Sequence, residues 1–179
     1  MADNETSIYP ALESLALSTH RVADPSTIPG RVTLDLDPDT WAEIDGRNMG
    51  YLNVLAAQHE QPSQFRTNIV VVLTRVIVGR GIDLAGLIEH SFTDSRRLPG
   101  WTEEHAEVWP PANRHSGWSI QSGTYSADGQ LLYTVTQYAV YQRGNVGYLL
   151  QATGTTTAEQ TPVFGSLLDK VVRSVNFDD

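Results

Sequence analysis

The chain has 179 residues, carries a formal net charge of −9 and contains no cysteine. This length suits one domain with residues to spare, and an apolar content of 40% is ordinary for a globular protein. The lack of cysteine excludes a thiol nucleophile, a disulfide, an iron–sulfur cluster and a cysteine-ligated zinc site in this chain. The negative charge disfavours general nucleic-acid binding, because phosphate groups would repel the protein.

The first residues do not have the pattern of a targeting segment. Met1–Pro10 is polar and acidic, without the basic start and apolar run of a secretory signal. No window of the sequence approaches the roughly 18 apolar residues of a membrane span. These observations predict a cytoplasmic protein.

A break in the chain follows this segment. Ala11–Leu17 has the pattern of a short amphipathic helical turn, too short to be stable alone. Asp24–Gly30 then contains two prolines and a glycine. We therefore predict a flexible N-terminal leader over residues 1–28 and a single domain over residues 29–179.

The first half of this domain contains strands followed by a helix. Apolar residues at every second position predict a strand over Arg31–Leu36, and Tyr51–Gln58 is a second candidate. Phe65–Val78 is rich in β-branched residues and almost continuously apolar, as in a strand covered on both faces. Asp83 is positioned to cap a helix over Leu84–Arg97, which has an apolar stripe at helical spacing.

The second half predicts a three-stranded meander. The strands are expected over Gly117–Tyr125, Gln130–Gln142 and Val146–Gly154. Asp128-Gly129 and Gly144-Asn145 lie between them and are typical of hairpin turns.

A second helix and a short strand complete the pattern. Pro162 fits the first turn of an amphipathic helix, and Val175–Phe177 is a candidate closing strand. Strands, a helix, a meander and a final helix together predict an α+β fold with an antiparallel sheet.

Several short motifs resemble those of a known family. They are Phe65–Val71 (FRTNIVV), Leu98-Pro99-Gly100, Gly123-Thr124-Tyr125 before Gly129, and Leu149–Thr155 (LLQATGT). With the long meander strand and the last helix, they resemble the LpqN/LpqT-like actinobacterial family, a branch of the Mog/PsbP-like superfamily. The resemblance covers residues 30–177 and implies an antiparallel sheet sandwiched by helices, an αβα arrangement.

The resemblance implies binding rather than catalysis. Other branches of the superfamily bind a Ran-type GTPase or dock on photosystem II, and the actinobacterial branch consists largely of cell-envelope lipoproteins. The family has no catalytic motif to carry over. This sequence lacks the signal and the lipid-bearing cysteine of such lipoproteins, and this departure is a further reason to expect a cytoplasmic protein.

The densest polar cluster lies between the first predicted helix and the meander. His105, Glu107 and His115 are candidate metal ligands there, because His105 and Glu107 alternate onto one face of an extended segment. A solvated acidic edge explains the same residues and suits a protein of this charge. No catalytic motif is present, and no metal or cofactor is predicted.

The aromatic residues are the best indication of a functional surface. Three tryptophans lie within eighteen positions, flanked by prolines and acidic residues, where exposure without use would be costly. Core packing is the alternative explanation for most aromatic side chains. The predicted binding residues are Trp101, Trp109, Trp118, Tyr125 and Tyr138.

The sequence therefore predicts a non-catalytic binding module for a protein partner or a small hydrophobic or envelope-derived ligand. One alternative is a metal-assisted hydrolase that uses His105, Glu107 and His115. The other is a cytosolic adaptor or chaperone of a secretion system, with residues 1–28 as a mobile arm.

Overall fold

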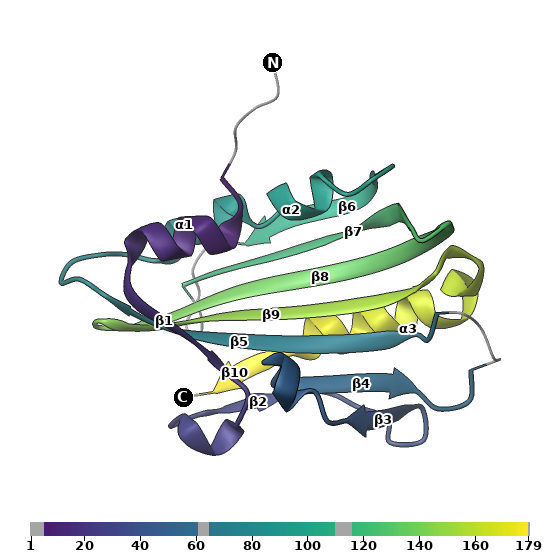
Figure 1. Ribbon diagram of the computed structural model, residues 1–179, viewed down its shortest axis with the longest axis horizontal. Coiled ribbons are helices and arrows are strands. Elements are labelled where there is room, and N and C mark those ends of the chain that lie inside the picture. The colour runs from purple at the N-terminus through teal and green to yellow at the C-terminus, as the bar shows by residue number, and fades with distance from the viewer. Residues whose placement is uncertain (1–5, 61–64, 110–115, 179) are drawn as a thin grey trace.

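A twisted antiparallel sheet forms the centre of the computed structural model, which describes residues 6–60, 65–109 and 116–178 (Figure 1). Seven strands follow the order β3-β4-β5-β9-β8-β7-β6, and β1 also pairs with β5. The strands of this sheet are β1 (Ala16–Val22), β3 (Trp41–Ile44), β4 (Asn53–Ala57), β5 (Asn68–Val78), β6 (Thr102–Trp109), β7 (Gly117–Ala127), β8 (Gln130–Arg143) and β9 (Val146–Thr157). A separate two-stranded sheet pairs β2 (Arg31–Thr33) with β10 (Asn176–Asp178).

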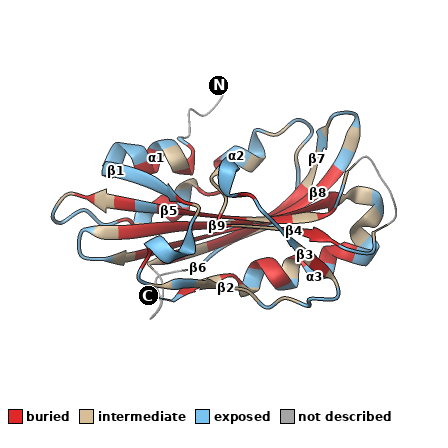
Figure 2. Ribbon diagram, turned by 60° about the horizontal axis from the view of Figure 1, so that its bottom comes forward, coloured by how far each residue is buried: buried red, intermediate tan, exposed pale blue. Residues whose placement is uncertain are grey.

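Helices lie on both faces of the main sheet, and each face has its own core. The helices are α1 (Ile8–Leu15), α2 (Thr93–Arg96) and α3 (Thr161–Ser174), with 3₁₀ turns η1 (Pro25–Thr27), η2 (Arg47–Met49), η3 (Ala85–His90) and η4 (Ala158–Gln160). α3 packs on one face with β10, whereas α1 and η3 cover the other. Figure 2 shows the buried residues concentrated along the central strands and on the inner side of α3. The predicted α+β class and αβα arrangement are confirmed.

β5 holds the two halves of the sheet together. β9 pairs along one edge of β5, while β4 pairs with residues 68–71 and β1 with residues 73–78 on the other edge. Most of its eleven residues are buried, as expected from its continuous apolar run.

The N-terminal segment differs from the predicted flexible leader. α1 buries Ile8 and Leu12, which are 0% and 1% exposed, against η3 and the sheet. β1 then pairs with β5 from Ala16 to Val22. A helix of this length is unstable alone, but burial of its apolar side supplies the missing stabilisation. Residues 8–22 are therefore part of the folded domain.

The predicted helix over Leu84–Arg97 is shorter and divided. η3 has i→i+3 hydrogen bonds at Leu87 and Ser91, and a short α2 follows. Asp83 does accept a hydrogen bond from the Ala85 N–H at 2.9 Å, as expected of a cap. The Leu84 N–H instead donates to the side chain of Gln142 on β8, so tertiary contacts shape this segment.

Candidate functional site

The end of β6 brings two tryptophans together at the rim of the sheet. β6 is the last strand in the sheet order, and within the described residues it pairs only with β7. The register places Trp109 opposite Trp118, so both indoles lie on one face. Their ring centroids are 6.0 Å apart at an interplanar angle of 70°, the edge-to-face geometry that aromatic pairs favour.

This pair is only partly covered by the protein. Trp118 packs against the core under α3, whereas Trp109 is 49% exposed and the neighbouring Val108 is 48% exposed. We call Val108, Trp109 and Trp118 the aromatic edge. Exposed apolar side chains on a strand at the end of a sheet are typical of surfaces that bind another protein.

The other part of β6 is acidic. Arg96 donates two hydrogen bonds to Glu103, at 2.9 and 3.0 Å, and Gln121 donates a third at 2.7 Å. These bonds, chiefly those from Arg96, hold the pKa of Glu103 below its usual range. His105 Nε2 lies 3.3 Å from Glu107 Oε2, and both side chains are partly exposed to solvent. The edge next to the aromatic pair therefore presents carboxylates to a partner.

The other predicted binding residues lie elsewhere. Trp101 precedes β6 and packs over Gly123 on β7. Gly123 and Trp118 are an odd number of positions apart on β7, so Trp101 lies on the face of the sheet opposite to Trp118. Tyr125 shares the face of Gly123, and burial raises its pKa. Tyr138 is buried in the core beneath α1, where desolvation strongly raises its pKa. Of the five predicted residues, the structure joins Trp109 and Trp118.

The candidate metal ligands do not form a site in the described part of the chain. His105 and Glu107 are neighbours, but His115 lies outside the described residues. Among residues 6–60, 65–109 and 116–178, no group of three or more metal-ligating side chains comes together.

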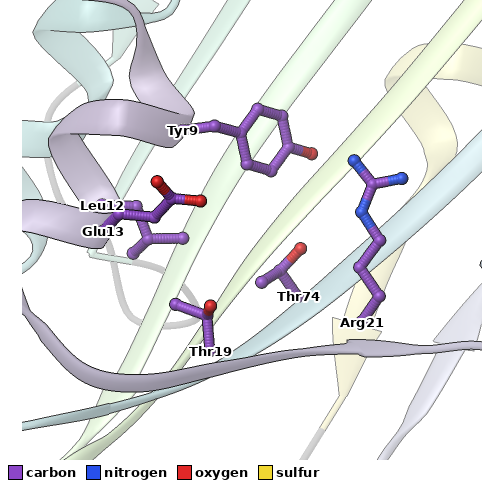
Figure 3. A pocket seen from close by; sticks show the side chains of 6 residues that line it. All are labelled: Tyr9, Leu12, Glu13, Thr19, Arg21 and Thr74. Carbon is purple, nitrogen blue, oxygen red and sulfur yellow. The ribbon is translucent and has the colours of Figure 1, made fainter.

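A pocket lies between α1, β1 and β5, on the face of the sheet opposite to Trp109 and Trp118 (Figure 3). Its volume is about 150 Å³, and its lining residues are Tyr9, Leu12, Glu13, Thr19, Arg21 and Thr74. The Tyr9 hydroxyl donates to Gln151 Oε1 at 2.7 Å, and burial raises its pKa to about 12. The Arg21 guanidinium carbon lies 5.6 Å from the centroid of the Tyr9 ring.

The pocket could not be predicted from the sequence, because five of its six lining residues belong to the predicted leader. The sixth, Thr74, pairs with Arg21 across β5 and β1, a contact that no local pattern reveals. The spacing of Tyr9 and Glu13, one helical turn apart, was the available signal that both project from one side of α1.

Comparison with known proteins identifies the family. A family model described as probable lipoprotein LpqN matches residues 7–176. The chain belongs to the LpqN family. The match includes α1 and β1 and confirms the resemblance predicted from the sequence.

A solved LpqN structure has the same fold. It is the crystal structure of LpqN involved in cell envelope biogenesis of Mycobacterium tuberculosis, with a TM-score of 0.77 and 16% identity. The similarity covers 98% of this chain and 99% of the other. The chain has no significant match among the curated proteins.

These findings show that the predicted cytoplasmic location is wrong. An LpqN family described as probable lipoproteins, with a structural relative in envelope biogenesis, points to the cell envelope. The prediction depended on the composition of the first residues and on the lack of a lipid-bearing cysteine, and neither feature decides where a protein works. No helix within the described residues is long and apolar enough to cross a membrane.

Proposed function

We propose that this chain is a non-catalytic binding protein of the cell envelope that acts in envelope biogenesis by binding another protein. The role of the Mycobacterium tuberculosis relative supports the process, and the family description supports the location. The observation that carries the binding function is the aromatic edge, where Trp109 remains half exposed beside Trp118.

The partner contributes an extended segment that pairs with β6. The last strand of a sheet presents backbone N–H and C=O groups that such a segment can use, as in other cases of strand addition. Trp109 then anchors the segment, because a large aromatic side chain next to a desolvated core is a frequent hot spot of interfaces.

Charge determines which partner fits. Glu104 and His105 are exposed on β6 and Glu107 is partly exposed, and the whole chain carries a net charge of −9. A second copy paired through β6 would bring like charges together, which opposes self-association. The partner segment is therefore basic.

Site-specific photo-cross-linking in cells tests this function. A photoreactive amino acid is placed at Val108 on the aromatic edge, or at Leu131 on β8, which is 51% exposed and serves as the matched control. We expect one envelope protein to be cross-linked from position 108 and not from position 131. Equal labelling from both positions, or none from position 108, would contradict the proposed interface.

Two substitutions then test the anchor. Trp109→Ala should reduce the cross-linked product about tenfold or more, the usual effect of removing an aromatic hot spot. Leu131→Ala should leave it unchanged. Both variants are to be checked by thermal unfolding, so that a loss of fold is separated from a loss of binding.

The two alternative functions gain no comparable support. His105 and Glu107 have no third ligand among the described residues, so a hydrolase centre lacks a scaffold there. A secretion adaptor with a mobile arm conflicts with the docking of residues 8–22 on the sheet.

A further inference from the structure

The pocket between α1, β1 and β5 contains a buried hydroxyl that the protein leaves unsatisfied. Thr74 is 4% exposed, and its Oγ1 lies close to the Tyr9 phenol but forms no hydrogen bond of regular geometry within the described residues. A buried polar group in this state costs free energy, so such groups are uncommon unless a ligand or water completes them. Figure 3 shows this oxygen on the side of Thr74 that faces Tyr9 and Arg21.

Opposite charges flank the same pocket. Figure 3 shows Glu13 from α1 on one side and Arg21 from β1 on the other, with Tyr9 and Thr74 between them. Within the described part of the chain, neither charged group forms an ion pair. Arg21 lies over the Tyr9 ring, a contact that fixes the guanidinium without neutralising it.

Size limits the ligand to a small molecule. A cavity of about 150 Å³ is large enough for a molecule the size of benzene, or roughly six to nine non-hydrogen atoms. Leu12 supplies an apolar wall, while the hydroxyls of Tyr9, Thr19 and Thr74 supply polar contacts. A simple anion would be repelled by Glu13, and a simple cation by Arg21.

We propose that this pocket binds a small zwitterion of the amino-acid class. Its carboxylate pairs with Arg21 and accepts a hydrogen bond from the Thr74 hydroxyl. Its ammonium group pairs with Glu13, and a short side chain lies against Leu12. This site is on the opposite face from the aromatic edge and is independent of the partner binding proposed above.

Titration of the isotope-labelled full chain, followed by NMR, tests the proposal with three probes. L-Alanine carries both charges, propionate only the negative one and n-propylamine only the positive one. We expect saturable shifts for the amides around Tyr9, Arg21 and Thr74 with L-alanine, and about tenfold weaker binding of the other two, since each loses one charge-assisted contact.

Charge-neutralising variants assign the two contacts. Arg21→Gln should weaken binding of L-alanine and propionate about tenfold but not that of n-propylamine. Glu13→Gln should weaken binding of L-alanine and n-propylamine about tenfold but not that of propionate. Arg75→Gln is the matched control, because Arg75 follows Thr74 on β5 and points to the other face. It should leave all three titrations unchanged.

Thr74→Val separates ligand binding from folding. Valine has nearly the same shape, so removal of the unsatisfied hydroxyl should raise the melting temperature while it weakens L-alanine binding.

The proposal is overturned if L-alanine gives no saturable shift, if propionate binds as well as L-alanine, or if Arg21→Gln and Arg75→Gln behave alike. Trp109→Ala should not alter L-alanine binding, so failure of one proposed site leaves the other to be judged separately.

Discussion

At the scale of single residues, the aromatic side chains have two different roles. Trp41 packs against Phe164 with ring centroids 6.4 Å apart, and Tyr148 lies 4.6 Å from Phe177, so these rings fill the core under α3. Trp109 leaves half of its surface in solvent. Residue type alone does not distinguish these roles, because the face on which a side chain lies depends on register.

Gly123 is the residue that lets Trp101 pack on the sheet. A Cβ at this position would lie 2.4 Å from the Thr102 carbonyl oxygen and 2.8 Å from the Trp101 indole. Because the clash with Thr102 involves backbone, Gly123→Ala should destabilise the protein by about 2 kcal/mol and displace Trp101. Urea unfolding measures the loss.

Gly86→Ala provides the control for this substitution. A Cβ at Gly86 would meet no atom within 4 Å, so the free energy of unfolding should change by less than about 1 kcal/mol. Equal stability of the two variants would show that β7 does not hold Trp101 in this way.

At the scale of elements, α1 and β1 act as one docking unit. β1 is exposed at most positions, so its backbone hydrogen bonds to β5 hold it rather than buried side chains. α1 supplies the apolar contacts that β1 lacks, and it packs against η3. The two charged sides of the proposed amino-acid site depend on this unit, because both Glu13 and Arg21 belong to it.

Two leucines on this unit test the docking. Leu12 is 1% exposed and Leu17 is 75% exposed. Leu12→Ala should lower the free energy of unfolding by roughly 2–4 kcal/mol, because it leaves a cavity in the core. Leu17→Ala should change it by less than about 0.5 kcal/mol. If both variants unfold like the wild type in urea, residues 8–22 behave as the flexible leader that the sequence predicted.

Sequence patterns predicted the strands whose side chains are buried. They missed the strands that are held in the sheet mainly by backbone hydrogen bonds. β5, β7, β8 and β9 show apolar alternation or continuous apolar runs, and all were predicted. β1 and β6 are mostly exposed and polar, so no periodicity marked them as strands. The meeting of Trp109 with Trp118 was within reach of sequence reasoning because only a few residues separate β6 from β7, and the two strands pair antiparallel. The pocket was not, because Tyr9, Arg21 and Thr74 meet only through strand pairing.

At the scale of the whole molecule, tyrosines in both cores couple folding to proton uptake. Burial raises the pKa of Tyr9 and Tyr138 on the α1 side and of Tyr133 and Tyr141 on the α3 side. Each phenol therefore holds its proton more tightly in the folded chain than in the unfolded chain, where its pKa is near 10. The stability that this difference supplies is complete below pH 10 and is lost as the pH rises towards the folded value, about 12 for Tyr9.

Alkaline unfolding should consequently be cooperative. We expect the ultraviolet absorbance of tyrosinate to rise together with the loss of the circular dichroism signal, because most tyrosines ionise only after the sheet opens. Tyr138→Phe removes one ionisable phenol. Above pH 10 the free energy of unfolding of this variant should therefore fall less steeply than that of the wild type, and the two slopes should differ by up to about 1.4 kcal/mol per pH unit. Tyrosinate absorbance that rises near pH 10 while the circular dichroism stays native would show instead that these phenols titrate within the folded protein.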